Sequence, residues 1–165
     1  MLPLDYPDRH FLLASEGWLE LGDPAESASE LRRLSKEGEL HPDVLELRWR
    51  LYAGKGEWEA ALAVSRTLVS AAPERPSGYI HQSYSLHELA RTEEAWELLL
   101  DTVDRFPKES VIAYNLACYA CQLGDLVVAR DWLQRAVKIR GKTEIKAMAM
   151  QDSDLSLLKG YIEGL

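Results

Sequence analysis

Apolar side chains recur along the chain at helical spacing. They follow the i, i+3, i+4, i+7 pattern that places side chains on one face of a helix. The clearest runs are Ala95, Leu98, Leu99, Thr102, Val103 and Phe106, and then Leu116, Ala117, Ala120 and Leu123. No stretch alternates between apolar and polar residues with the period of two expected of a half-buried strand. The pattern therefore predicts an all-α chain.

A period of 34 residues organises these helices. Gly22, Gly56, Ala90 and Gly124 follow one another at steps of 34 residues, each in a polar break between apolar runs. Five residues further on lies a small side chain, as close contact between two helices requires. These small residues are Ser27, Ala61, Ala95 and Ala129. A fixed period of this length is typical of stacked supersecondary units that bury their faces against one another.

Each repeat is predicted to be two antiparallel helices joined by a tight turn. First helices are expected at about 8–21, 43–55, 77–89 and 110–123, and second helices at about 24–37, 58–72, 92–105 and 126–140. After a looser segment over 143–150, a final helix is expected over 153–162. Asp152, Ser153 and Asp154 offer N-cap oxygens for it. Its apolar stripe is expected to lie on the 126–140 helix and consists of Leu155, Leu157, Leu158, Tyr161 and Ile162.

These features resemble the tetratricopeptide repeat (TPR) family, whose signature combines Trp-x2-Leu-Gly-x2-Tyr, Ala-x3-Phe and Pro on a 34-residue period. The fourth repeat matches best, through Tyr114, Leu116, Ala117, Gly124 and Ala129. The resemblance implies a right-handed superhelical array of antiparallel helix hairpins, an α-solenoid. It implies a single domain over 1–165, with repeats at about 8–41, 42–75, 76–109 and 110–143 and a C-terminal capping helix in 144–165.

Charge and composition exclude several other classes of protein. The 165 residues carry a formal net charge of −8, which disfavours nucleic acid as the main partner because phosphate binding needs a basic surface. No apolar run approaches the roughly 20 residues needed to span a bilayer, and no membrane partner is expected. The first residues lack the basic region and apolar run of a secretory signal, so we expect a cytoplasmic protein. Two cysteines disfavour a disulfide scaffold.

The TPR resemblance also implies which side chains face a partner. In that family the first helices line a concave groove, and positions 10, 9, 6 and 3 residues before the turn residue point into it. They are Leu12, Leu13, Glu16 and Leu19; Glu46, Leu47, Arg50 and Ala53; Ile80, His81, Tyr84 and His87; and Tyr114, Asn115, Cys118 and Cys121. The candidate partner-binding residues among them are Glu46, Arg50, Ile80, His81, Tyr84, His87, Tyr114, Asn115 and Cys118.

The types of these side chains suggest individual roles. Tyr84 and Tyr114 are candidate anchors, since an aromatic ring presents a large area with a polar tip. The competing interpretation is that both rings pack against adjacent helices. Asn115 is suited to holding a peptide backbone, because its amide both donates and accepts hydrogen bonds. Glu46 and Arg50 are expected to set the charge preference, with a mutual ion pair as one arrangement.

No catalytic or metal-binding pattern emerges from the sequence. His81, His87, Cys118 and Cys121 have the side chains of a zinc site, but the histidines are six residues apart on a helix, so their directions diverge. Buried cysteines are usually small hydrophobes, which favours packing. The sequence has no Gly-rich phosphate loop and no nucleophile elbow. We therefore expect no enzyme activity, no metal and no cofactor, and a non-catalytic module that binds a protein or peptide.

Two other functions remain open at this stage. Small acidic TPR proteins resemble dedicated chaperones for secreted bacterial proteins. A self-assembling scaffold is the second, because residues 1–109 are acidic whereas a stretch near 130–146 is basic. One residue also departs from the pattern of the repeats. Trp49 stands where Ser15, Ser83 and Ala117 stand in the others, which suggests a wider gap between the first two repeats.

Overall fold

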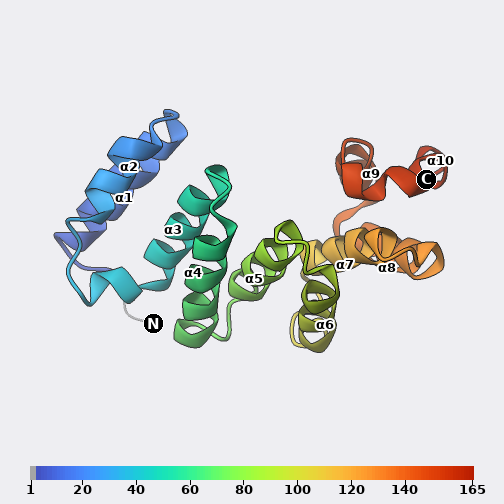
Figure 1. Ribbon diagram of the computed structural model, residues 1–165, viewed down its shortest axis with the longest axis horizontal. Coiled ribbons are helices and arrows are strands. Elements are labelled where there is room, and N and C mark those ends of the chain that lie inside the picture. The colour runs from blue at the N-terminus through green and yellow to red at the C-terminus, as the bar shows by residue number, and fades with distance from the viewer. Residues whose placement is uncertain (1–2) are drawn as a thin grey trace. The chain divides into compact units, whose positions relative to one another are not determined.

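Helices make up all the regular structure of residues 3–165, the part of the chain that the computed structural model describes. Four helix pairs follow one another in the order predicted (Figure 1). The pairs are α1 (Asp8–Glu20) with α2 (Pro24–Leu31), α3 (Pro42–Gly54) with α4 (Trp58–Ala71), α5 (Pro76–Glu88) with α6 (Thr92–Thr102), and α7 (Ser110–Gln122) with α8 (Leu126–Arg140). The all-α class is therefore confirmed.

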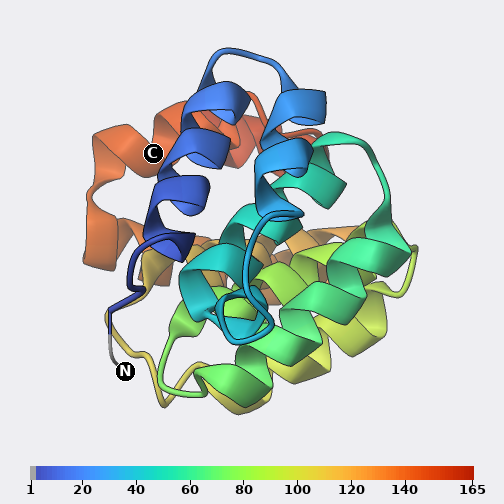
Figure 2. The ribbon, with the colours of Figure 1, turned by 90° about the vertical axis from the view of Figure 1, so that its left-hand side faces the viewer.

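The chain divides into two compact units, one extending to Ser85 and the other beginning at Leu86. In the N-terminal unit, α1 packs against α2 and α3 packs against α4, and each pair runs antiparallel (Figure 2). In the C-terminal unit, α7 packs against α8 in the same way. The helical hairpin is thus the building block of both units.

The 34-residue period is the period of left-handed turns. Gly22, Gly56, Ala90 and Gly124 have φ angles of 80°, 70°, 59° and 88°. In each case the next residue's N–H donates to the carbonyl five residues earlier, at 2.9 Å. The pairs are Asp23 to Trp18, Glu57 to Tyr52, Arg91 to Leu86, and Asp125 to Ala120. This is the Schellman arrangement that ends a helix on a left-handed residue, so the sequence period reports helix C-termini.

The small residues predicted at the helix contacts are fully buried. Ser27, Ala61, Ala95 and Ala129 all have 0% exposure. In the first hairpin a second small residue faces Ser27, because the Ser15 hydroxyl lies 2.8 Å from both the carbonyl and the hydroxyl oxygen of Ser27. Ser27 therefore takes in this hairpin the place that Ala61, Ala95 and Ala129 take in the others, and its hydroxyl is satisfied by Ser15.

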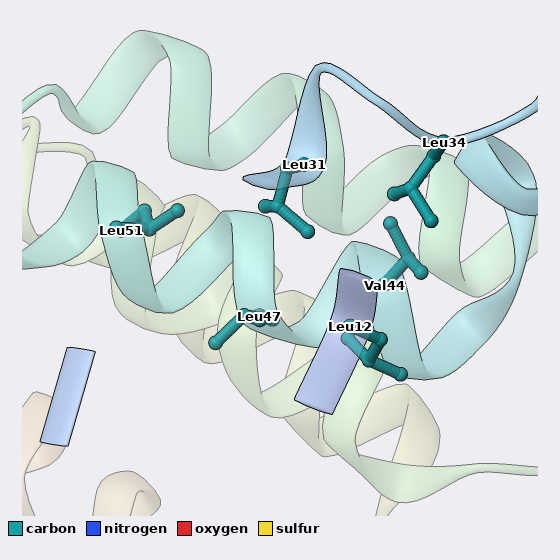
Figure 3. Packing of buried hydrophobic residues seen from close by; sticks show 6 residues of the cluster. All are labelled: Leu12, Leu31, Leu34, Val44, Leu47 and Leu51. Carbon is teal, nitrogen blue, oxygen red and sulfur yellow. The ribbon is translucent and has the colours of Figure 1, made fainter. Parts of the chain in front are cut away.

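The core of the N-terminal unit joins α1, α2 and α3. Six buried aliphatic side chains form it: Leu12, Leu31, Leu34, Val44, Leu47 and Leu51 (Figure 3). The prediction that Leu12 and Leu47 line the groove is therefore wrong. Both side chains are needed to close the contact between the first hairpin and α3, and neither exposes more than a few per cent of its surface.

The second helix of the first repeat is shorter than predicted. α2 ends at Leu31, and a turn leads to the 3-10 segment η1 (Gly38–Leu40). Asp8, buried at the start of α1, accounts for the early end. Its carboxylate accepts from the Ser35 backbone N–H at 2.9 Å and from the Ser35 hydroxyl, which in turn accepts from the N–H of Gly38 at 3.0 Å. These bonds hold the chain in a turn that competes with a longer helix.

The C-terminal segment also differs from its prediction. The expected loose stretch is the helix α9 (Lys142–Ala149), entered through Gly141, whose φ of 105° ends α8. The expected final helix is split into the 3-10 segment η2 (Ser153–Leu158) and the short α10 (Lys159–Glu163). The predicted N-cap is confirmed, since the Asp152 side chain accepts from the N–H of Asp154 at 3.0 Å.

This C-terminal segment packs on α7 as well as on α8, where it was expected. Leu155 and Leu158 are almost fully buried, and the three-residue period of a 3-10 helix places them on one side. Leu157 falls off that side and is 65% exposed, so its predicted place in the apolar stripe is wrong. Ile162 from α10 and Ile145 from α9 complete the buried set.

Candidate binding face

Four aromatic side chains gather on α3, α4 and α5 within the N-terminal unit. We call Trp49, Trp58, His81 and Tyr84 the aromatic cluster. The His81 ring stacks on the Trp49 ring with centroids 3.8 Å apart and planes 9° apart. The Tyr84 ring meets Trp49 edge-on, with centroids 6.1 Å apart, and is tilted against Trp58, with centroids 5.6 Å apart. Such offset and edge-on pairs fix the rings relative to one another.

Hydrogen bonds to α5 fix the aromatic cluster on one side, and its other side is exposed to solvent. Trp49 Nε1 donates to the Ser85 hydroxyl at 2.9 Å, and that hydroxyl donates to the His81 carbonyl at 2.8 Å. Burial lowers the pKa of His81 to about 4, so its ring is neutral near pH 7. Tyr84 stands at the edge with 38% of its surface exposed. A fixed, uncharged aromatic surface with one protruding ring is therefore accessible here.

Trp49 accordingly has a different role from the one expected. Its ring packs on His81 of α5, toward the following repeat, and the predicted wider gap between the first two repeats is not what accommodates it. Ser15 on α1, which holds the equivalent position in the first repeat, is buried against Ser27. The small residue Ser85 on α5 gives the indole both room and a hydrogen-bond acceptor.

A charged group of residues lies at the start of α3 and α5. Arg75 Nη1 donates to the Asp43 carboxylate at 2.6 Å and to the Glu46 carboxylate at 3.3 Å. The Ser77 hydroxyl donates to the same Glu46 oxygen at 2.7 Å. The hydrogen bond with Asp43 is the largest cause that raises the pKa of Arg75. The suggested pair of Glu46 with Arg50 is therefore wrong, because Glu46 is engaged by Arg75 and Arg50 is exposed.

The corresponding face of α7 in the C-terminal unit is covered by the chain's own tail. The Tyr114 hydroxyl donates to an Asp152 carboxylate oxygen at 2.8 Å, and the Cys118 thiol donates to the same oxygen at 3.6 Å. Burial raises the pKa of the Cys118 thiol well above its usual value. Tyr114 and Cys118 are only 5% and 4% exposed. The packing interpretation of Tyr114 thus describes this structure.

The second contact of the tail involves α5's last turn and the end of α7. His87 Nε2 lies 3.0 Å from the Asp154 carboxylate, and His87 Nδ1 lies 2.9 Å from the Thr92 hydroxyl. Gln122 Nε2 donates to the Asp154 carbonyl at 2.9 Å. Together with the buried Leu155 and Leu158, these bonds make the tail an integral layer of this unit.

The remaining candidate site residues are partly or fully buried. Ile80 and Asn115 are both partly buried. Cys118 and Cys121 are buried free thiols. No group of three or more His, Cys, Asp or Glu side chains within residues 3–165 is arranged to hold a metal ion.

The basic stretch of the C-terminal unit is largely engaged within the unit. The guanidinium groups of Arg130 and Arg135 lie 5.3 Å and 5.0 Å from the ring centroids of Tyr161 and Trp132. Arg140 pairs with Glu144 at 2.7 Å. Lys146 Nζ donates to the carbonyl of Glu163 at 2.6 Å and to that of Leu165 at 3.1 Å, which secures the chain end. None of the helices in residues 3–165 combines the length and apolar character needed to cross a bilayer.

The sequence analysis does not identify the roles of three residues in these contacts, which are Trp49, Trp58 and Asp152. Trp49 stands out there only as a departure, although a large aromatic residue at a small position signals that the ring packs elsewhere. Trp58 has no distinguishing signal, because one aromatic residue at the start of a predicted second helix does not indicate which neighbours its ring contacts. Asp152 is predicted as an N-cap, and its second role toward Tyr114 depends on the path of the tail.

Known proteins resemble this chain in fold and not in sequence. It matches no model of a protein family, and no curated protein matches it significantly. TTC0263, a thermophilic TPR protein of Thermus thermophilus, is 19% identical, with a TM-score of 0.71 over 96% of this chain and 100% of that chain. MamA (41-end) from Desulfovibrio magneticus RS-1 is 16% identical, with a TM-score of 0.73 over 98% and 94%.

PilF of Pseudomonas aeruginosa shows the same likeness. It is 17% identical, with a TM-score of 0.75 over 94% of this chain and 69% of that chain. At such identities the likeness concerns the fold alone. Together with the four left-handed turns at 34-residue spacing, it shows that this chain has the fold of TPR proteins, as its repeats predict.

Proposed function

We propose that this protein is a non-catalytic interaction module that binds a segment of another protein on the α3–α5 face of its N-terminal unit. The observation that supports the proposal most is the aromatic cluster, in which Tyr84 is fixed by two tryptophans and still 38% exposed. A rigid aromatic residue costs little conformational entropy when a partner packs on it, and such residues are frequent binding hot spots.

Side chains around the cluster give the proposed face its selectivity. Arg50 is exposed on α3, one residue after Trp49, and offers an accessible cation to a partner carboxylate. Glu46 shares its carboxylate with Arg75 and Ser77, so it contributes a fixed local dipole more than a free charge. His81 is neutral and stacked, and it supports the ring of Trp49. The preferred segment would therefore carry an apolar or aromatic residue beside an acidic one.

The C-terminal unit contributes less directly to this proposal. A partner would reach Tyr114, Cys118 or His87 only after displacing Asp152 and Asp154, together with the buried Leu155 and Leu158. Burying two leucines stabilises the tail by about 3–6 kcal/mol, which a short segment would have to replace. Those residues, with Asn115, remain predicted contacts, and Tyr84, Arg50 and Ile80 are the ones we propose to act first.

The test compares three forms of the full chain. Wild type, Tyr84→Ala with Arg50→Ala, and the control Tyr6→Ala are used for affinity capture from a native cytoplasmic extract, followed by mass spectrometry. Tyr6 is 84% exposed and lies outside the aromatic cluster, so its loss matches the loss of an exposed tyrosine. Overlapping synthetic segments of each captured protein are then measured by fluorescence polarisation.

We expect a segment that binds wild type and the Tyr6→Ala protein equally and the double variant at least about tenfold more weakly, which corresponds to roughly 1.4 kcal/mol. Equal binding to all three proteins would contradict the proposed face. Sedimentation at low and high salt distinguishes the scaffold alternative from the proposed function. Only an assembly held by opposite charges changes its sedimenting mass when the ionic strength changes. Preferential capture of unfolded secretory precursors would instead favour the chaperone alternative.

A further inference from the structure

A cavity of about 350 Å³ opens between α2 and α3 in the N-terminal unit. It shares no residue with the aromatic cluster. Its floor is apolar, because the buried side chains of Leu31 and Leu51 and the partly buried Ala28 line it. Its rim is cationic, with Arg32, Arg48, Lys55, Glu39 and Tyr52 around it. The cavity thus combines an apolar base with a polar mouth.

The cavity exists because the first repeat lacks volume that the other repeats have. α2 has only 8 residues, whereas α4 has 14, so no further helical turn extends over α3. Ala28 adds a second loss of volume. At steps of 34 residues its position is occupied by Leu62 and Trp96, whose larger side chains would fill this space.

The charged side chains at the mouth of the cavity also differ from the residues at equivalent positions of the other repeats. Arg48 Nη2 lies 3.1 Å from the Glu39 carboxylate, so this cation is paired. Arg32 and Lys55 are exposed and form no ion pair within residues 3–165. The positions equivalent to Lys55 hold Leu89 and Leu123. Two cations beside an apolar floor are conspicuous in a chain whose net charge is −8.

We propose that this cavity binds a small amphipathic carboxylate, an alkyl chain of about six to eight carbons ending in an anion, which fits a site of this size. The chain would lie on Leu31 and Leu51, where it loses contact with water. The carboxylate would accept hydrogen bonds from Arg32 and Lys55 at the mouth, and bonds to a charged acceptor are the stronger kind. A bare anion leaves the floor unused, and a neutral chain leaves the cations without a partner.

Octanoate is the probe for this site. The ¹⁵N-labelled full chain is titrated with octanoate, octanamide and acetate while amide resonances are recorded. We expect saturable shifts at Ala28, Leu31 and Lys55 with octanoate, and binding at least about tenfold weaker for the two others, because each lacks one half of the ligand. Shifts that do not saturate, that centre elsewhere, or that octanamide reproduces at equal concentration would overturn the proposal.

Paired variants connect the binding to the cavity. Ala28→Trp places in the cavity the residue that the third repeat has at this position, and Ala28→Leu does the same with the residue of the second. The control Ala25→Trp adds the same ring on an exposed position of the same helix. We expect either Ala28 variant to lose octanoate binding while the Ala25 variant keeps it. If the tryptophan variant does not fold, the leucine variant decides the matter.

A charge series tests the mouth of the cavity separately. Arg32→Gln with Lys55→Gln removes both unpaired cations, and Arg66→Gln with Lys108→Gln changes the net charge equally at exposed positions outside the cavity. The first double variant is expected to weaken octanoate binding about tenfold or more and to leave octanamide unchanged. Equal effects of the two double variants would show that only the overall charge matters, and would overturn the assigned site.

Discussion

The Tyr114 hydroxyl donates a 2.8 Å hydrogen bond to the Asp152 carboxylate, and this contact joins the inner face of α7 to a residue 38 positions further along the chain. Burial raises the pKa of the Tyr114 phenol, so the group stays protonated and remains a donor at every ordinary pH. The bond is part of the structure of the C-terminal unit, and its loss is therefore expected to be measurable as a loss of stability.

Tyr114→Phe and Asp152→Asn should each lower the free energy of unfolding by about 1–2 kcal/mol, because phenylalanine cannot donate this bond and a neutral amide accepts it less strongly than a carboxylate. Urea unfolding followed by far-ultraviolet circular dichroism measures this change. The control is Tyr161→Phe, which removes a hydroxyl that accepts from the exposed Gln134. In a double-mutant cycle the two changes should be less than additive, and strict additivity would mean that the bond is absent in solution.

Ala90 is the one non-glycine residue with a positive φ in residues 3–165. Ala90→Gly should raise the free energy of unfolding by about 0.5–1 kcal/mol, because an L-residue in the left-handed region has an unfavourable Cβ contact that glycine lacks. Gly56→Ala is the matched reverse change. The nearest atom to its added Cβ is 4.0 Å away, so its expected loss of about 1 kcal/mol reflects backbone conformation alone.

Thermal and urea unfolding of these two variants provide the measurement. If both changes shifted stability in the same direction, the left-handed turn would not be the cause.

The stability of the N-terminal unit should fall as the pH falls from about 6.5 toward 4. Burial lowers the pKa of His81 to about 4 in the folded chain, below its usual 6.5, so in this range the unfolded chain binds more protons. The effect is bounded at about 3 kcal/mol, since each pKa unit corresponds to about 1.4 kcal/mol. Urea titrations at several pH values, read from tryptophan fluorescence, measure it.

His81→Phe keeps a ring on Trp49 without a titratable group and should flatten this part of the pH profile. His10→Phe, the same change at an exposed histidine on α1, is the matched control. An unaltered slope in the His81 variant would assign the pH dependence to other groups.

Gly38 should tolerate no side chain. A Cβ atom at this position would overlap the Asp8 carboxylate, which is itself held by Ser35. Gly38→Ala is expected to cost about 1–3 kcal/mol, because either the carboxylate or the turn must move. In the Asp8→Ala background the same change should cost clearly less, since the overlapping atoms are gone. Chemical unfolding of the four proteins gives the comparison, and an undiminished cost would locate the strain elsewhere.

Much of the fold follows from the sequence because local chemistry and long-range packing agree in it. The left-handed turns favour glycine, as at Gly22, Gly56 and Gly124, and close helix contact favours small residues, as at Ala61 and Ala95. Both requirements return with each hairpin, so a single chain displays them several times. The 34-residue period for this reason predicts the fold better than any single residue does.

The sequence prediction is wrong where a distant residue decides the local structure. α2 ends early because the carboxylate of Asp8, 27 positions before Ser35, accepts a hydrogen bond from the Ser35 N–H and so holds the chain in a turn. The 3-10 segment η2 begins after Asp152, whose side chain caps it and also accepts from the hydroxyl of Tyr114, 38 positions earlier. Neither cause is visible within a window of neighbouring residues.

The candidate site can be predicted only in part for the same reason. Helical spacing places His81 and Tyr84 on one face, and both belong to the aromatic cluster. The same spacing gives no means to see that Asp152 returns to Tyr114 and Cys118. Periodicity therefore predicts which side chains share a surface. It does not predict that the C-terminal segment packs over that surface.

The covered thiol of Cys118 makes the tail observable without a label. Its sulfur is buried beside Asp152, and its raised pKa keeps it protonated, so an alkylating reagent can react only when the segment over α7 opens. The rate of alkylation at low reagent concentration then measures the free energy of that local opening rather than of global unfolding. A ligand that binds only the closed form would slow the reaction, and one that replaces the tail would accelerate it.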